Sequence, residues 1–530
     1  MSKQTMSKNP MLVIDAYKLG HIGMYPDGMS EAYANLTPRN FRIAKNLFPN
    51  KSDGTSFFDD KLIVFGTSAM LQIMIEEFDE YFFNRDLDEM IAEYIDVITP
   101  FLGGADSRKI IEAVSSLYDL GYLPLAFKAM PEGSKVGPGV PILTWYNTHP
   151  DFAWLPGYME TYISTNSWKS HTTATIAGVY RKIGEYFAEL TGADPMSVNF
   201  QFHDFSSRGL SGSQDVMTTG AAHLTQFWGS DSISSVPYIN RYYKGALSDI
   251  IGLSVPATEH SVMCAGGKDD ELSTYRRLFK QYPTGIISIV SDTWDYWNLI
   301  TKGLVELKDE ILEREENDMG LAKVVIRPDS GDPADIVCGT ESNSSVRYLA
   351  KDQGYENVSA FDAPEAFGTV EVMAEIFGTT KTEKGYKELN PRIGLIYGDS
   401  ITPHRAYDIL DRLMHKNFTS SNIVFGVGSY SYQYNTRDTF GFAVKTTNIR
   451  VNDLSQPIFK DPKTDRKKTS AKGYMAVLDM DGEFVMTDMV DRDTPSVLKE
   501  VLRDSKFDDE QLPSFEDVRL RSRLNTGVKI

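Results

Sequence analysis

The chain has 530 residues, enough for a large core, and this length predicts two or three domains or one barrel with additions. Its 54 basic and 73 acidic side chains give a formal net charge of −19, which argues against a nucleic-acid-binding surface and favours small-molecule substrates. Two cysteines are too few for a disulfide framework, no apolar run is long enough to predict a membrane span, and the polar N-terminus does not resemble a signal peptide. We therefore expect a cytoplasmic protein that contacts neither nucleic acid nor membrane.

The first region, residues 1–155, is expected to combine helices and strands. The stretch Thr67–Phe83 predicts a helix, and Leu123–Trp145, with its glycines and prolines, predicts strands joined by turns. The segment Lys45–Asp60 is polar and rich in turn residues, so we expect a surface insertion there.

The second region, residues 156–430, repeats one pattern: a short apolar run that ends abruptly in Gly, Asp, Ser or Arg. Such runs predict strands covered on both faces, and the spacing between them leaves room for crossover helices, as in a parallel α/β barrel. In such barrels the chemistry lies at the carboxyl ends of the strands, where this chain places Arg327, Asp329 and Asp399. The runs are Asn199–Gly209, Gly285–Asp292, Leu321–Pro333, Arg392–Ser400 and Asn422–Ser429.

The third region, residues 431–530, is expected to hold strands near Phe440–Lys445 and Tyr474–Leu478, followed by an acidic helical tail. It also contains a dense cluster of cations. In an acidic protein this cluster suits a phosphate or diphosphate, although a solvated charged turn explains it equally well. The cluster consists of Lys460, Lys463, Arg466, Lys467, Lys468 and Lys472.

Two turns at strand ends have a possible ligand-binding role. Phe425–Tyr430 (FGVGSY) lies where a strand should give way to a helix, so its backbone N–H groups could face a phosphate; the alternative is an ordinary tight turn. The turn Pro328–Gly331 is common in itself, but Arg327 before it and Asp399 on another strand add an anion-binding cation and a carboxylate suited to ribose hydroxyls or Mg²⁺.

A series of short motifs in collinear order resembles the nicotinamide phosphoribosyltransferase family, and the resemblance covers nearly the whole chain. The motifs are DAYKLGH at Asp15, HDFSSRG at His203, GSD at Gly229, SVPATEHS at Ser254, SIVSD at Ser288, IRPDSGDP at Ile326, GDS at Gly398, TRD at Thr436 and FKDP at Phe459.

This resemblance implies a fold, an assembly and a reaction. The fold is an irregular α/β barrel with an additional sheet-containing domain built from the N- and C-terminal segments. The assembly is a head-to-tail homodimer whose two active sites take residues from both subunits. The reaction joins nicotinamide to 5-phosphoribosyl 1-diphosphate with Mg²⁺, and ATP hydrolysis is expected as a coupled step.

Four residues match the family's pyridine site. Phe205 matches the aromatic that stacks on one face of the ring, and Tyr17 matches the partner subunit's aromatic on the other face. Asp231 matches the acceptor of the carboxamide NH₂, and Ser288 is a neighbour of the amide oxygen. The alternatives are ordinary core aromatics and a helix-capping aspartate. A nicotinate carboxylate about 4 Å from Asp231 would be repelled by roughly 4 kcal/mol, so the amide is the expected substrate.

The remaining matches concern the phosphoribosyl donor. His260, Asp329 and Asp399 are the candidate catalytic residues, and His260 is either a diphosphate contact or the residue phosphorylated during ATP coupling; outside the family such a histidine is usually structural. Asp292 lies near the expected metal region. The substrate-binding matches are Arg208 and Arg327 for phosphates, Gly398 for ribose, Ser429 for the phosphate loop, and Arg39, Arg437, Lys445, Lys460 and Lys468 for cations presented by the other subunit.

The sequence departs from the family at several glycine positions. Ser429 and Tyr430 stand where the phosphate loop usually has glycines, and Ser400 stands where glycine is common after Asp399. Two rivals remain: nicotinate phosphoribosyltransferase, and a catalytically silent nucleotide-binding protein of the same fold.

Overall fold

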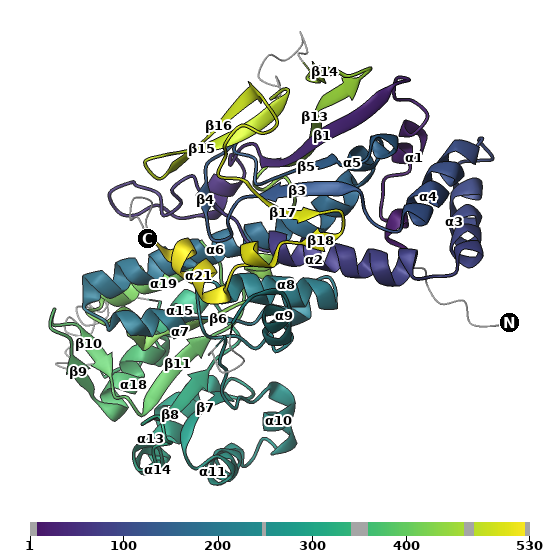
Figure 1. Cartoon of the computed structure of the whole chain (residues 1–530). Coiled ribbons are helices and arrows are strands. Elements are labelled where there is room, and N and C mark those ends of the chain that lie inside the picture. Colours follow the sequence, from purple (N-terminus) through teal and green to yellow (C-terminus); the bar gives the residue numbers. More distant parts are fainter. Residues whose placement is uncertain (1–7, 246–250, 341–358, 461–470, 525–530) are drawn as a thin grey trace.

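The computed structural model describes residues 8–245, 251–340, 359–460 and 471–524, and two sheets organise them (Figure 1). An antiparallel sheet forms one part of the molecule and a curled parallel sheet forms the other. Long helices, above all α6 (Glu160–Thr191), lie between the two parts. No described helix is long and apolar enough to cross a membrane.

The antiparallel sheet is built from both ends of the chain, as expected. Its strand order is β14-β13-β1-β5-β3-β17-β18, and β1 lies between β5 and the C-terminal strand β13. Both faces of its central strands are buried: Leu36 and Trp145 belong to the main core on one face, and Tyr33 and Tyr146 pack with Tyr474 on the other. The strands are β1 (Met29–Pro38), β3 (Leu125–Ala129), β5 (Leu143–Asn147), β13 (Phe442–Val451), β14 (Leu454–Pro457), β17 (Lys499–Arg503) and β18 (Lys506–Phe507).

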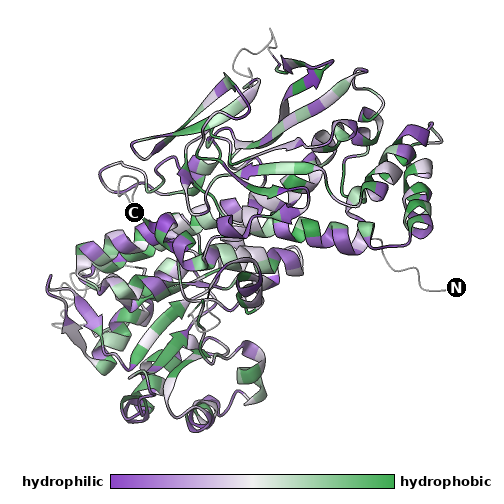
Figure 2. Ribbon diagram, in the orientation of Figure 1, coloured by the Kyte–Doolittle hydropathy of each residue, from purple (hydrophilic) through white to green (hydrophobic). Residues whose placement is uncertain are grey.

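The parallel sheet contains all five of the predicted apolar strands. Its order is β6-β12-β11-β8-β7, and Figure 2 shows these strands as largely hydrophobic ribbons. The strands are β6 (Phe202–Asp204), β7 (Gly285–Val290), β8 (Ala322–Arg327), β11 (Ile393–Tyr397) and β12 (Val424–Val427). The main helices around them are α8 (Ser213–Leu224), α9 (Ser235–Tyr242), α10 (His260–Ala265), α11 (Glu271–Gln281), α15 (Pro333–Cys338), α18 (Thr369–Phe377) and α19 (Pro403–His415).

Isolated parallel bridges close this sheet into an irregular barrel. Asp204 at the end of β6 bridges to Ser230, Gly229 bridges to Leu253, and Ala257 bridges to Ser288 on β7. Backbone hydrogen bonds of 2.7–3.1 Å support these bridges, so the ring is continuous although two of its segments are too short to form strands. The expected irregular α/β barrel is confirmed.

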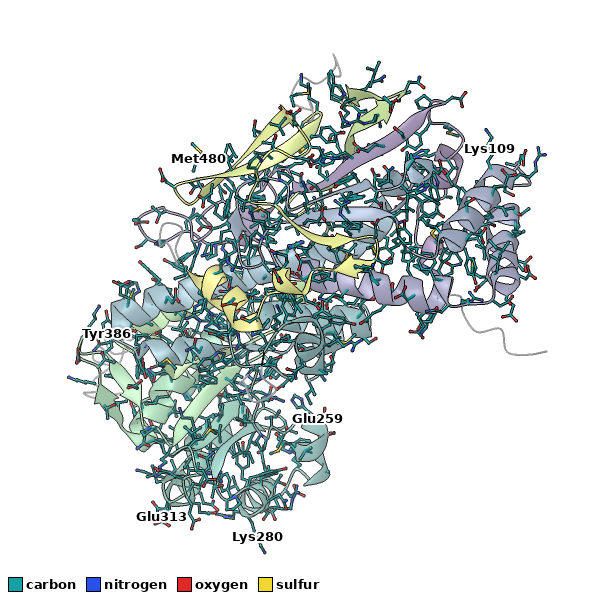
Figure 3. The ribbon with its side chains drawn as sticks, in the orientation of Figure 1. Lys109, Glu259, Lys280, Glu313, Tyr386 and Met480 are labelled. Atoms are coloured by element: carbon teal, nitrogen blue, oxygen red, sulfur yellow. The ribbon has the colours of Figure 1, made fainter. Side chains whose placement is uncertain are left out.

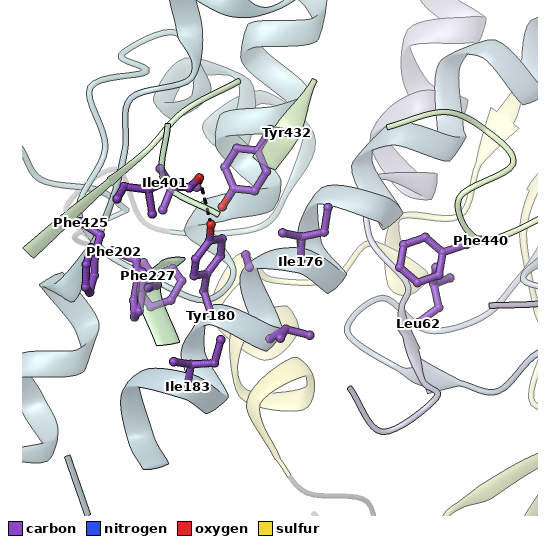
Figure 4. Close-up of a cluster of buried hydrophobic side chains, with 14 of the residues drawn as sticks. Leu62, Ile176, Tyr180, Ile183, Phe202, Phe227, Ile401, Phe425, Tyr432 and Phe440 are labelled. Atoms are coloured by element: carbon purple, nitrogen blue, oxygen red, sulfur yellow. Dashed lines mark hydrogen bonds between the residues drawn. The ribbon is translucent and has the colours of Figure 1, made fainter. Parts of the chain in front are cut away.

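Helix α6 joins the two sheets through one hydrophobic core (Figure 4). Ile176, Tyr180 and Ile183 project from it towards the barrel aromatics Phe202 and Phe425. The same core cluster includes Leu36 and Phe442 of the antiparallel sheet, so all three sequence regions, 1–155, 156–430 and 431–530, contribute to it. At 32 residues the helix is about 48 Å long, enough to span both parts.

The peripheral elements confirm some expectations and correct others. The predicted helix at Thr67–Phe83 is α2 (Thr67–Phe78) followed by one π-helical turn. In the described part of the acidic tail, strands come first, and the helices are a 3-10 turn at Asp509–Gln511 and α21 (Phe515–Arg523). The other elements are α1 (Tyr17–His21), β2 (Leu62–Ile63), α3 (Leu87–Phe101), α4 (Arg108–Leu120), β4 (Lys135–Val136), α5 (Leu155–Tyr158), α7 (Val198–Gln201), α12 (Tyr296–Asn298), α13 (Leu304–Glu306), α14 (Lys308–Leu312), α17 (Pro364–Phe367), β9 (Thr379–Lys381), β10 (Lys387–Leu389), α20 (Ser429–Tyr432), β15 (Tyr474–Met480) and β16 (Glu483–Val490).

The segment 45–60 is not simply a surface insertion, and that expectation was wrong in part. Its polar residues are exposed, but Phe48, Phe57 and Phe58 are buried at 3–4% exposure. Phe58 contacts Phe41 and Phe440 edge to face. Because three aromatic side chains enter the core, this loop is anchored to the fold.

Candidate active site

The carboxyl ends of the five parallel strands bring the predicted residues to one edge of the barrel. Phe205 follows β6, Asp292 follows β7, Arg327 ends β8, Asp399 follows β11 and Ser429 follows β12. Parallel strands place these ends together because every strand runs in the same direction. We call the group Phe205, Asp231, Ser288, Arg327, Asp329 and Asp399 the barrel mouth.

Two glycines make room for the Phe205 ring. A Cβ added to Gly426 would lie 2.2 Å from the ring, and one added to Gly398 would lie 2.9 Å from it. The Arg327 guanidinium carbon is 5.9 Å from the ring centroid. The ring therefore crosses the ends of β11 and β12, and the prediction that Phe205 and Gly398 belong to one site agrees with this packing.

Asp231 is held as an anion by its neighbours. His203 Nε2 lies 2.9 Å from Asp231 Oδ1, and the Ser254 hydroxyl donates to the same oxygen at 2.5 Å. Burial alone would raise the pKa of Asp231, but the His203 and Ser254 hydrogen bonds and the field of Arg327 together lower it below its ordinary value. Among the described residues, both hydrogen bonds fall on Oδ1, which leaves Oδ2 for a ligand.

Sequence reasoning missed Asp204, which positions the loops on both sides of the site. Its carboxylate is fully buried and accepts hydrogen bonds from the Ser206 amide (2.9 Å) and hydroxyl (2.6 Å) and from the hydroxyls of Ser230 (3.2 Å) and Ser232 (2.5 Å). It thereby fixes the turn after Phe205 and the turn that carries Asp231. The sequence feature that could have revealed Asp204 is the abundance of serines in the HDFSS and GSDS motifs, which include its partners Ser206, Ser230 and Ser232. His203 and Ser254 were each quoted only within a motif.

Two buried polar atoms at the barrel mouth lack a protein partner in the described structure. They are Ser288 Oγ and Arg327 Nε. Arg327 donates to the Thr258 carbonyl at 2.7 Å. Burial lowers the pKa of Arg327, although Asp329, Asp231 and Asp292 oppose the shift. Unpaired buried polar groups are costly, so these two atoms indicate a site shaped for a polar ligand, and Arg327 lies within electrostatic range of Asp231.

The acidic residues form a second cluster beside Arg327. Asp292 Oδ1 lies 3.1 Å from His260 Nε2, and Oδ2 accepts the Asp329 amide (3.0 Å) and the Ser330 hydroxyl (2.6 Å). Burial and the nearby Asp292 and Asp399 raise the pKa of Asp329, and Arg327 opposes this. Figure 3 labels Glu259, the residue before His260, at the exposed surface of the barrel. Among the described residues, no three His, Cys, Asp or Glu side chains are grouped to hold a metal ion.

One departure from the family pattern has a visible cost. Ser400, which follows Asp399, adopts a left-handed backbone with φ of +51°. Glycine takes this conformation without strain, whereas other residues adopt it rarely. The turn keeps the glycine geometry although a serine occupies it.

The predicted cations gather elsewhere, on the antiparallel sheet. We call Tyr17, Arg39, Arg437, Lys445 and Lys460 the cation face. Burial lowers the pKa of Lys445, and the nearby Arg39 and Lys460 lower it further, so the three cations are neighbours. Burial and Asp15 raise the pKa of Tyr17 while Arg437 opposes the rise, which puts Arg437 within electrostatic range of Tyr17.

The cation face and the barrel mouth are not joined within the described chain. No hydrogen bond or ion pair links Tyr17, Arg39, Arg437 or Lys445 to the barrel mouth in the described residues. Arg208 belongs to the barrel side, because its charge lowers the Arg327 pKa. Lys468 lies outside the described residues, as do Lys463, Arg466 and Lys467.

A parallel barrel whose strand ends carry an aromatic, paired carboxylates and an arginine is the arrangement of a barrel enzyme for small polar substrates. Comparison with known sequences makes this specific. The chain belongs to the nicotinate phosphoribosyltransferase (NAPRTase) family, whose sequence profile matches residues 200–506.

Curated relatives and solved structures agree with this assignment. A protein from Acinetobacter baylyi named nicotinamide phosphoribosyltransferase is 48% identical over 91% of this chain and 90% of its own length. One of the same name from Mycoplasma pneumoniae is 33% identical over 87% of this chain and 94% of its own length. The fold is similar to that of nicotinate-nucleotide pyrophosphorylase from Pyrococcus furiosus, with a TM-score of 0.51 at 12% identity over 98% of this chain and 97% of that one. It is also similar to human nicotinic acid phosphoribosyltransferase, with a TM-score of 0.50 at 14% identity over 97% and 93%.

Proposed function

We propose that this chain is a pentosyltransferase that transfers the phosphoribosyl group of 5-phosphoribosyl 1-diphosphate to nicotinamide, forming nicotinamide mononucleotide and diphosphate in NAD salvage. The observation that carries the proposal is an anionic Asp231 at the barrel mouth of a chain 48% identical to a protein named nicotinamide phosphoribosyltransferase. The carboxamide NH₂ can donate to the free Oδ2, whereas the carboxylate of nicotinate would meet a like charge.

The buried polar atoms of the barrel mouth suit the rest of the substrate. The Ser288 hydroxyl, which lacks a protein partner in the described structure, is available to donate to the amide oxygen. Phe205 offers a ring for stacking against the pyridine. Asp329 and Asp399 are the carboxylates we assign to the ribose hydroxyls, and the Arg327 Nε–H, which lacks a partner in the described structure, is available for a phosphate oxygen.

The reaction needs positioning more than proton transfer. Pyridine N1 has a free lone pair and no proton to lose, so it attacks the ribose C1 carbon without a general base. As the C1–diphosphate bond breaks, negative charge grows on the leaving group, and cations stabilise it. Positive charge develops on the ribose, and the nearby carboxylates of Asp329 and Asp399 favour that charge. Holding the two reactants together supplies much of the remaining acceleration.

A divalent metal ion would enter with the diphosphate. Both Asp292 oxygens already accept protein hydrogen bonds, so Asp292 fits the positioning of His260 and Asp329 better than direct coordination. Mg²⁺ bound to the donor would neutralise part of the diphosphate charge.

His260 is the residue we propose for ATP coupling. Its side chain is 48% exposed, and Asp292 contacts Nε2, which leaves Nδ1 free to face a ligand. A histidine oriented by a carboxylate in this way can accept a phosphoryl group or simply bind the diphosphate. ATP-dependent labelling of the parent and of His260→Ala distinguishes these two roles.

The cation face supports a homodimer with shared sites. It presents cations suited to phosphate, and among the described residues no hydrogen bond or ion pair joins Tyr17, Arg39, Arg437 or Lys445 to the barrel mouth of the same chain. We propose that it closes over the barrel mouth of a second subunit. The two free cysteines, Cys264 and Cys338, suit the cytoplasm, the compartment we propose.

The test is one incubation of the purified chain with 5-phosphoribosyl 1-diphosphate, Mg²⁺ and either nicotinamide or nicotinate, with and without ATP, followed by product mass. We expect nicotinamide mononucleotide, in higher yield with ATP. Nicotinate mononucleotide alone would favour the nicotinate rival. Neither product would favour the silent nucleotide-binding protein and overturn the proposal.

A further inference from the structure

The segment 429–433, which follows β12 and includes the short helix α20, is fixed on its interior side by helices α6 and α8; we call it the turn after β12. These two helices pack against each other (Figure 1). Three consecutive residues here have interior partners in these helices: Tyr180 of α6 contacts Ser431 at 2.6 Å, His223 of α8 contacts Tyr432 at 2.7 Å, and Lys169 of α6 donates to the Gln433 side-chain oxygen. Because the interior side of the turn is fixed, its outer side, which begins at Ser429, has a defined position.

All three anchors also reach a second loop: Tyr180 contacts the Ile401 carbonyl at 3.3 Å, His223 contacts the Gly229 carbonyl at 3.1 Å, and Lys169 connects to the loop after β6. The Lys169 amine pairs with Asp215 at 2.5 Å, and both side chains are mostly buried, at 16% and 13% exposure. Asp215 accepts the Ser211 backbone amide at 2.8 Å, and the Gln433 amide donates to the Ser211 hydroxyl at 2.6 Å. Lys169 thus joins α6, the loop after β6 and the turn after β12.

The two joined loops carry the expected phosphate contacts. Arg208 lies on the loop after β6, and Ser429 begins the turn after β12. The two loops touch at Gly209 and Ser429, because a Cβ added to Gly209 would lie 2.4 Å from the Ser429 Cβ. The Gln433 backbone amide donates to the Ser429 carbonyl at 2.8 Å, so a shift of Gln433 moves Ser429 as well.

We propose that Lys169 is a positioning residue for the phosphate subsite. Through Gln433 and Asp215 it sets the spacing between Ser429 and Arg208, and it thereby governs affinity for the phosphoribosyl donor without touching that donor. The inference rests on the proposed function. A buried amine paired with one carboxylate and one amide oxygen is costly to disturb, because removing it leaves Asp215 without its counterion.

The test replaces Lys169 by methionine, which keeps the length of the side chain and removes its charge. The matched control is Lys182→Met, on the same helix, whose amine pairs with Asp59 at 2.7 Å and has no described contact with either loop. For Lys169→Met we expect the KM for 5-phosphoribosyl 1-diphosphate and the inhibition constant of inorganic diphosphate to rise together, about tenfold or more, with the nicotinamide KM within about twofold of the parent. The control should leave all three constants unchanged.

A second variant guards against misfolding. Lys169→Met combined with Asp215→Asn removes both charges and so avoids an unpaired buried carboxylate. It should keep the raised donor KM, because Gln433 still lacks its donor. A donor KM near that of the parent in a folded variant, or an equal rise in the nicotinamide KM, would overturn the proposal. If the parent forms no product, the proposed function fails instead, and calorimetric binding of diphosphate to parent and variants still decides the role of Lys169.

Discussion

The barrel mouth and the cation face differ in how far one chain completes them. At the barrel mouth, Asp231 has two hydrogen-bond partners within the same chain, and Arg327 is held by the Thr258 carbonyl and by the charges of three aspartates. On the cation face, Arg437 is more than half exposed, and its described ion pair, with the adjacent Asp438, spans 3.6 Å. The barrel mouth is preorganised within its own chain, whereas the cation face, which we propose as the other half of the site, is displayed on a surface.

This difference teaches what each half contributes. Preorganised groups stabilise charge with little rearrangement, so the barrel mouth should determine the rate and the choice of substrate. Exposed cations attract and hold an anion but gain most when a partner excludes water from them. Substitutions in the two halves should therefore have different kinetic signatures.

The largest effect is expected from Arg327→Met. The side chain is largely buried among three carboxylates, and its removal takes away both a phosphate contact and their counterion. We expect kcat/KM to fall by about 100- to 1000-fold, as when one preorganised donor is removed. Steady-state kinetics measures this, and Arg327→Lys is the control, because lysine keeps the charge but not the planar fork. A loss below tenfold would place Arg327 outside the site.

Asp231→Ser should change the choice of substrate. Repulsion of about 4 kcal/mol is an upper bound, since the Asp231 side chain is 43% exposed and solvent screens the charge. We expect the preference for nicotinamide over nicotinate, measured as a ratio of kcat/KM values, to fall by about 10- to 100-fold. An unchanged ratio would show that Asp231 does not select the amide.

Arg437→Ala should act on binding alone. The side chain is 54% exposed and contributes little to the fold, so the melting temperature should stay that of the parent. We expect the donor KM to rise about tenfold with the nicotinamide KM unchanged. Raising the salt concentration should reproduce part of this effect in the parent, because the cation face is screened and the barrel mouth is not.

The smallest effect concerns the stability of the fold and involves helix α6, which joins the two sheets. His171 is fully buried and accepts the Phe65 amide at 2.9 Å, and burial lowers its pKa to about 3. As the pH falls below the ordinary value near 6.5, the unfolded chain takes up a proton that the folded chain refuses, so stability decreases by up to about 1.4 kcal/mol per pH unit. Urea unfolding at pH 7 and pH 5 should show this loss of unfolding free energy. His171→Gln should have a shallower slope of unfolding free energy against pH, by the equivalent of about one proton. Equal slopes in the parent and the variant would contradict this role.

The sequence predicted the elements that a hydrophobic pattern encodes. Five apolar runs became five parallel strands, and the residues after them gathered as parallel geometry requires. The segments that close the barrel could not be predicted in this way, because Gly229 and Leu253 form single bridges without an apolar run. The burial of Phe57 and Phe58 was hidden by their polar neighbours, since a local average ignores two side chains that turn inwards.

The site was predicted by resemblance where local pattern was silent. Nothing in the spacing of Asp231 reveals that His203 and Ser254 hold it, because these residues meet only through the curl of the barrel. Asp204 escaped notice because a buried carboxylate that binds serines resembles an ordinary turn residue until its partners are seen. The cations were recognised, but only the structure shows that Lys445 of β13 lies beside Arg39 and Lys460.

Subunit complementation tests the central claim most directly. One variant carries Arg327→Met in the barrel mouth, the other carries Arg39→Ala and Arg437→Ala on the cation face, and differently tagged copies are co-expressed so that the mixed species can be purified. If each site combines the two halves from different subunits, the mixed dimer has one intact site. Assayed at a donor concentration near the parent KM, it should show about half of the parent activity, although each homodimer retains only a small fraction of it. A mixed species no more active than the average of its two homodimers would contradict a site shared between subunits.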